Sequence, residues 1–200
     1  MSVAMEEGPR RHRITVEEYH RMAEVGLLAP DARVELIEGE IIDMPPIGSR
    51  HAAIVTRLHK LLIHAMGDSA IVWCQFPVQL GDFSEPQPDL ALLAPREDFY
   101  EQRLPIGPDT LLVIEVSETT LRYDRQIKLP LYARHGIPEY WIFDTQGKQL
   151  HVFRRPSDAT YGEVLFMDKP GVMPIAALPG VTVDLSSLFS AVSGEVIHPT

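Results

Sequence analysis

Two short apolar runs near the middle of the chain flank a charged segment with helical spacing. The runs are Leu111–Val116 and Glu139–Phe143, and turn-type residues end each of them. Short runs that are apolar at nearly every position are typical of strands buried on both faces of an α/β sheet. Between them, Asp124 and Lys128 are four residues apart and would share one face of a helix. The pattern therefore predicts two central strands with a helix between them.

The rest of the chain alternates helical and strand patterns. Thr15 and Glu18 have the spacing of a capping box, which predicts a helix over residues 16–26. Further elements are predicted as a hairpin over 31–43, a helix over 49–66, strands over 71–80, 90–93, 149–154 and 162–167, and a last strand over 181–183. No repeat, low-complexity tract or linker divides this pattern. We therefore expect a flexible arm over 1–13 and a single mixed α/β domain over 14–200.

Composition narrows the class of protein. The chain has 200 residues, of which 45% are apolar and 23% charged, as in ordinary globular domains. No apolar stretch approaches the roughly 20 residues that span a bilayer, the first residues lack the apolar core of a signal peptide, and the single Cys74 excludes an internal disulfide. We expect a cytoplasmic protein that does not bind membranes.

The negative net charge of the chain does not by itself decide which kind of molecule the protein binds. A net charge of −10 argues against loose, non-specific binding of nucleic acid, which depends on Lys and Arg neutralising phosphates. It leaves room for a local basic groove, and for carboxylates gathered around a metal ion. Charge alone leaves the partner open.

Two carboxylates are candidates for chemistry because they occur at buried strands. Asp89 opens the apolar run at 90–93, and Glu115 lies near the end of another. Carboxylates brought together on neighbouring strands repel, and a divalent cation relieves that repulsion. Oxygen ligands without clustered His or Cys favour Mg²⁺, or Mn²⁺, over zinc. A bound metal would activate water and stabilise charge on a phosphoryl oxygen.

Glu35 and Lys128 complete the candidate set, and each candidate also has an ordinary explanation. Lys128 could orient the attacking water or neutralise developing charge, or it could only pair with Asp124 on a solvated helix. Glu35 could be an exposed strand residue, Asp89 could simply start a strand, and Glu115 would need a buried partner in any case. In the catalytic interpretation, replacing Lys128 slows turnover and leaves the melting temperature unchanged. The helix after Lys128 should kink at Pro130, which removes one hydrogen bond.

Several segments together resemble the Uma-two family of restriction-endonuclease-like proteins, which belongs to the PD-(D/E)xK nuclease superfamily. The similarity covers nearly all of the chain after residue 13. The most specific part is the central block. The matching segments are VELIEGEIIDMPP, His51, QPDLALL, LLVIEVSETTLRYDRQIKLPLYARHGIPEYWIFD and ALPGVTVDL.

The resemblance implies a mixed central sheet flanked by helices, with Asp89 and Glu115 as metal ligands. It also implies that the Val116 carbonyl contacts the metal and that Glu35 is an accessory acidic residue. One position departs from the superfamily pattern, because the lysine expected two residues after Glu115 is Ser117 here. Lys128 would have to reach back into the site from the following helix.

These observations favour a Mg²⁺-dependent nuclease that hydrolyses phosphodiester bonds in DNA. Two alternatives stay open: a non-catalytic nucleic-acid- or protein-binding module that retains the nuclease fold, and a metal-dependent hydrolase of another phosphoester. We also expect a homodimer, because cutting both strands of a duplex needs two sites and a two-fold dimer matches the symmetry of DNA. The outer strands after Gln149 offer edges for that pairing. The roles of Ser117 and Asp124, the target sequence and the strandedness of the substrate do not follow from these patterns.

Overall fold

A computed structural model describes residues 9–189 of the chain, which form two compact units. The described part of the first unit comprises residues 9–46 and 79–86, and that of the second comprises 47–78 and 87–189. Residues 1–8 of the predicted arm over 1–13 lie outside the described residues. None of the helices within residues 9–189 has both the length and the apolar composition needed to cross a bilayer.

The first unit contains one helix and a β-hairpin, both as predicted. The helix begins at the capping box, where the Glu18 N–H donates to Thr15 Oγ1 at 3.1 Å and the Thr15 N–H donates to Glu18 Oε2 at 2.8 Å. The hairpin turns at Glu38 and Gly39, whose φ angles of 51° and 85° suit a tight two-residue turn. The elements are α1 (Val16–Glu24), β1 (Val34–Ile37) and β2 (Glu40–Asp43).

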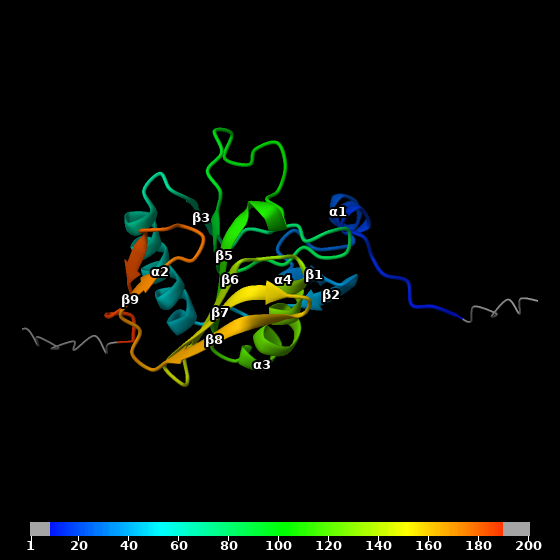
Figure 1. Ribbon diagram of the computed structural model, residues 1–200. Helices are drawn as coiled ribbons and strands as arrows, with labels where there is room; N and C mark the ends of the chain where they lie inside the picture. The colour runs from blue at the N-terminus through cyan, green and yellow to red at the C-terminus, as the bar shows by residue number, and fades with distance from the viewer. Residues whose placement is uncertain (1–8, 190–200) are drawn as a thin grey trace, which may run out of the picture. The chain divides into compact units, whose positions relative to one another are not determined.

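The second unit is organised around a six-stranded mixed sheet, with strands in the order β3-β4-β5-β6-β7-β8 (Figure 1). Only β5 and β6 run parallel within this sheet, and its other neighbouring pairs are antiparallel. A parallel pair needs a crossover connection, and here the connection is helical. The strands are β3 (Ile71–Cys74), β4 (Leu90–Leu93), β5 (Thr110–Ser117), β6 (Glu139–Asp144), β7 (Gln149–Ser157) and β8 (Thr160–Met167).

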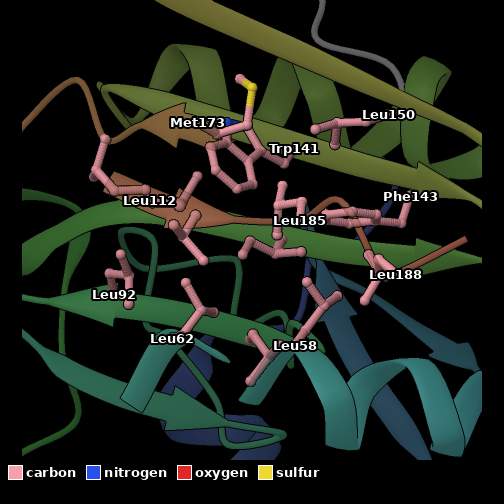
Figure 2. Packing of buried hydrophobic residues seen from close by; sticks show 14 of the residues in the cluster. Leu58, Leu62, Leu92, Leu112, Trp141, Phe143, Leu150, Met173, Leu185 and Leu188 are labelled. Carbon is pink, nitrogen blue, oxygen red and sulfur yellow. The ribbon is translucent and has the colours of Figure 1, made fainter. Parts of the chain in front are cut away.

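One face of this sheet packs against α2 (Ser49–Met66) and a small hairpin formed by β9 (Val172–Pro174) and β10 (Thr182–Asp184). Figure 2 shows Leu58 and Leu62 of the helix beside the sheet residues Leu92 and Leu112, with Trp141 further along the same core. These strand residues alternate with side chains that point to the opposite face, because successive side chains of a strand point to opposite sides. The main hydrophobic core of the unit therefore lies between α2 and the sheet.

The crossover between β5 and β6 covers the other face. It runs through α3 (Leu121–Tyr123), η2 (Asp124–Lys128) and α4 (Leu129–Arg134) as consecutive helical turns. A short 3₁₀ turn, η1 (Gly107–Asp109), precedes β5. Helices therefore lie on both faces of a mixed sheet, and the predicted fold class is confirmed (Figure 1).

A buried ion pair lies at the start of β6, at the opposite end of the sheet from Asp89 and Glu115. Glu139, which is 0% exposed, accepts a hydrogen bond from Arg154 Nε at 2.6 Å and from Trp141 Nε1 at 2.8 Å. Its second oxygen accepts the Ala176 N–H at 2.8 Å, and Arg154 also donates to the Pro174 carbonyl at 2.8 Å. The pair therefore joins β6 and β7 to the segment that follows β9.

We expect Arg154→Ala to lower the free energy of unfolding by about 3–5 kcal/mol, because the Glu139 carboxylate would remain buried without its cation. Arg155→Ala is the matched control, since the Arg155 side chain is 79% exposed and its bond to Glu163 is a surface pair. That control should cost about 0–1 kcal/mol. Urea unfolding followed by tryptophan fluorescence gives both values, and equal costs for the two variants would contradict the buried pair.

Candidate active site

Asp89 lies directly before β4, and hydrogen bonds hold its side chain. Leu90 pairs with Ile114 of β5, so one further step along the antiparallel ladder brings Asp89 opposite Glu115. The Val116 N–H donates to Asp89 Oδ2 at 2.8 Å, and His51 Nε2 lies 2.8 Å from Asp89 Oδ1. Asp89 therefore does more than begin a strand: its side chain is fixed against β5 and the first turn of α2.

Glu115 lies within β5 on the sheet face that the crossover helix covers. It is 5% exposed, and its Oε1 accepts hydrogen bonds from Lys128 Nζ and from the Tyr132 hydroxyl, each at 2.9 Å. Lys128 is itself only 1% exposed. The interpretation of Lys128 as a residue on a solvated helix face is therefore wrong, and Glu115 has the buried partner that its position requires.

A π-helical turn, η2, presents Lys128 to the sheet. The Leu129 N–H donates to the Asp124 carbonyl, five residues earlier, which widens the helix by one residue in this turn. Pro130 has no N–H to donate, and its ring crowds the carbonyl four residues before it, so an ordinary α-helical turn is disfavoured here. The structure has a wider turn immediately before α4, and the kink predicted at Pro130 stays a prediction.

Ser117 occupies the position where the superfamily pattern has its lysine, and it bonds to the helix. Its hydroxyl donates to Asp124 Oδ2 at 2.6 Å, and the Thr120 hydroxyl donates to the same oxygen at 2.7 Å. Asp124 is 2% exposed, and this burial raises the pKa of its carboxyl group. The charge of Lys128 and the two hydroxyls act in the opposite direction.

The donor chemistry around Asp89 and Glu115 suits a hard divalent cation. The two carboxylates would supply oxygen ligands, and ions such as Mg²⁺ complete their coordination with several waters. Among residues 9–189 no three His, Cys, Asp or Glu side chains come together as a metal-binding group. The oxygen-donor chemistry of Asp89 and Glu115 is what fits a hard ion held through few protein ligands. The Val116 carbonyl remains a predicted ligand, while its N–H bonds to Asp89.

Glu35 lies in β1 of the first unit, whereas Asp89, Glu115 and Lys128 belong to the second. It is 2% exposed, so the simple interpretation as an exposed strand residue is wrong. Its accessory role stays a prediction.

His51 and Tyr132 are the residues whose contacts the sequence patterns did not reveal. Burial acts to lower the pKa of His51, but the hydrogen bond and charge of Asp89, together with the Val116 backbone and the charge of Glu118, raise that pKa overall. No partner at i+4 marks His51 as functional, and only its place in the family resemblance pointed to it. Tyr132 lies four residues after Lys128, and this helical spacing could have placed both on the same face.

Comparison with known proteins gives the family and a similar fold. A family model described as "Putative restriction endonuclease", Uma2, matches residues 16–186. The chain belongs to the Uma2 family. The fold of this Uma2 protein is similar to a crystal structure from Anabaena variabilis, described as a "putative nuclease belonging to DUF820", with a TM-score of 0.66 and 20% identity. The match covers 88% of this chain and 98% of the other. No curated protein matches.

Burial changes what replacing Lys128 should do. In metal-free protein, Lys128→Ala should lower the free energy of unfolding by about 3–5 kcal/mol, because Glu115 would lose the ammonium group that compensates it. The exposed Lys60 of α2 provides a control, and Lys60→Ala should stay within about 0.5 kcal/mol of wild type. Chemical unfolding in EDTA measures both, and an unchanged midpoint for Lys128→Ala would contradict the buried pair.

Proposed function

We propose that this Uma2 protein is a divalent-metal-dependent nuclease that hydrolyses phosphodiester bonds in DNA. The observation that carries the proposal is the buried bond between Lys128 and Glu115, directly beside Asp89 on the neighbouring strand. Two carboxylates and a cation gathered at the ends of two central strands are the groups that metal-assisted phosphodiester hydrolysis requires. The family match and the similar nuclease fold support the same reaction class.

Asp89 and Glu115 would hold the metal ion, which we propose is Mg²⁺, with Mn²⁺ as a substitute. The ion would supply positive charge for the negative charge that develops on the scissile phosphate. The chain's own donors orient the two ligands. The Val116 N–H and His51 each fix one oxygen of Asp89, and the Tyr132 hydroxyl fixes Glu115. Ligands oriented in this way need little rearrangement when the ion binds.

Lys128 supplies the second positive charge of the site. Its ammonium group lies 2.9 Å from Glu115 Oε1, so it is already desolvated and directed at the carboxylate cluster. A preorganised donor in a water-poor site stabilises charge that appears in the transition state, and losing one such donor typically costs about 10²–10³ in rate. We therefore assign Lys128 to turnover as well as to the compensation of Glu115.

The crossover that buries Lys128 also exposes two arginine side chains to solvent, and these support a nucleic-acid substrate. Arg122 and Arg125 are exposed on α3 and η2, and Arg125 lies over the ring of Phe166 at 5.6 Å. Exposed arginines bind phosphates through several donors at once. They offer a local basic contact in a chain whose net charge is −10. The cytoplasmic location stays a prediction.

Asp89→Asn and Glu115→Gln should each weaken Mg²⁺ and Mn²⁺ binding in calorimetry and abolish cleavage. The substrates are supercoiled plasmid, linear duplex and single-stranded DNA, each with Mg²⁺, with Mn²⁺ and with EDTA. Wild-type protein should cleave with metal and not with EDTA. Asp158→Asn is the matched control, because Asp158 is an exposed carboxylate at a hairpin turn whose φ of 50° asparagine tolerates well.

The other outcomes separate the alternatives. Metal-independent retention of DNA without cleavage would favour a binding module on the nuclease fold. Hydrolysis of a small phosphoester in place of DNA would favour the other hydrolase. Unchanged metal binding in both carboxylate variants would remove Asp89 and Glu115 as ligands.

We also propose a homodimer that pairs through β8, one of the two edge strands of the six-stranded sheet. Three consecutive apolar residues of β8 are exposed: Val164 by 44%, Leu165 by 39% and Phe166 by 51%. Because successive side chains of a strand point to opposite faces, both faces of the sheet are apolar and exposed at this edge. An apolar edge strand is a template for pairing with another chain. A second copy related by a two-fold axis would cover both faces of this edge at once.

Light scattering should give wild-type protein a mass of twice the 22.5 kDa chain. Val164→Lys should shift it to the monomer, because a charge on the edge opposes strand pairing. Phe99→Lys is the control, since Phe99 is 68% exposed away from this strand and its replacement should leave the dimer intact. A wild-type mass of one chain would rule out the stable dimer.

A further inference from the structure

Asp124 is a buried carboxylate that neither metal binding nor direct contact with Glu115 explains. It begins the π-helical turn, and its side chain is 2% exposed. Buried acidic side chains are rare unless they are paired or hydrogen-bonded. Its contacts connect the crossover to β5, which precedes it, and to β6, which follows it.

The contacts come from three directions. The Ser117 hydroxyl at the end of β5 and the Thr120 hydroxyl in the loop after it both donate to Asp124 Oδ2, at 2.6 and 2.7 Å. The Tyr140 hydroxyl on β6 donates to the Asp124 carbonyl at 3.3 Å. The start of the π turn is thus fixed two residues beyond Glu115 along the same strand. Because Lys128 is the last residue of that turn, fixing its start also fixes where the ammonium group can reach.

Charge gives Asp124 a second effect on Lys128. One ammonium group serves two buried carboxylates, Glu115 through a direct bond and Asp124 through its charge. If Glu115 binds a divalent cation, part of its charge is taken by the metal, and the metal and Lys128 repel each other. Asp124 then remains as the negative charge that holds Lys128 in the buried site.

We propose that Asp124 is a positioning residue for Lys128: it anchors the π turn through Ser117 and Thr120 and keeps the lysine in the site when metal binds. This inference rests on the proposed nuclease function for its kinetic consequence. Its structural consequence, the placement of Lys128, does not depend on catalysis.

Asp124→Asn keeps the shape of the side chain and removes its charge. We expect it to lower kcat by about 10²-fold, the effect of a catalytic group displaced by about an ångström, with KM and Mg²⁺ affinity unchanged. The decisive measurement is a double-mutant cycle in single-turnover cleavage. In a Lys128→Ala background, Asp124→Asn should cause no further loss, because it acts only through the lysine. An equal loss in both backgrounds would overturn the proposal.

A second readout uses metal-free protein and needs no activity. The chain contains four lysines, at positions 60, 128, 148 and 169, so side-chain ¹³C labelling gives few resonances and Lys128→Arg identifies the one of interest. Asp124→Asn should shift the Lys128 resonance and leave the other three in place. Glu139→Gln, a buried carboxylate bound to Arg154 in the same sheet, should lower stability without moving that resonance.

Two further outcomes keep the inference separate from folding and from the proposed function. If Asp124→Asn does not fold, Ser117→Ala removes one anchor and should shift the Lys128 resonance in the same direction by a smaller amount. If wild-type protein cleaves no substrate, the nuclease proposal fails while the NMR comparison still decides where Lys128 is held. An unmoved Lys128 resonance in both variants would overturn the inference.

Discussion

A carboxylate can remain charged inside a buried sheet only if a cation lies against it. Two strands of the central sheet carry such a carboxylate, and each carboxylate has a different cation as its partner. Glu139 takes Arg154 from the neighbouring strand, and Glu115 takes Lys128 from the crossover helix. The position of that helix, the widened turn within it and the hydroxyl contacts of Asp124 all depend on bringing an ammonium group to Glu115.

The two pairs differ in what they permit. Arg154 bonds Glu139 and a backbone carbonyl at the same time, while Trp141 and the Ala176 N–H complete the carboxylate's partners. Such a fully bonded pair joins segments of chain. Glu115 is instead bonded to lysine, a compact charge on a flexible stem that can adjust when another cation approaches. We therefore assign the proposed chemistry to the β5 pair and a structural role to the β6 pair.

Local signals were sufficient for most of the fold. The capping box at Thr15, the turn at Glu38-Gly39 and the apolar runs of β5 and β6 each encode their structure within a few residues, and the structure agrees with them. The inward direction of Lys128 could not be read in the same way, because a π turn shifts the helical phase on which spacing arguments rest.

The contacts of His51 with Asp89 join residues 38 positions apart and are a property of the tertiary fold. The sequence indicated Asp89 and Glu115 because carboxylates at buried strands need explanation wherever they occur. Lys128 joined them as a cation on the following helix, and Glu35 was named with them but lies in the first unit. It did not indicate that Ser117 and Asp124 would bond to each other, because each is an ordinary residue in its own segment.

The single parallel pair in the sheet has a consequence for how Glu115 obtains its positive partner. Parallel neighbouring strands require a crossover connection, and in this sheet the crossover between β5 and β6 carries Lys128. The strands therefore provide the pairing, and the connection provides the positive charge. Position 117 supplies a hydroxyl that bonds to Asp124 of the crossover, while the positive charge comes from Lys128. The strand that carries the carboxylate and the connection that carries the lysine are thus held together by a pair of hydroxyls as well as by the buried ion pair.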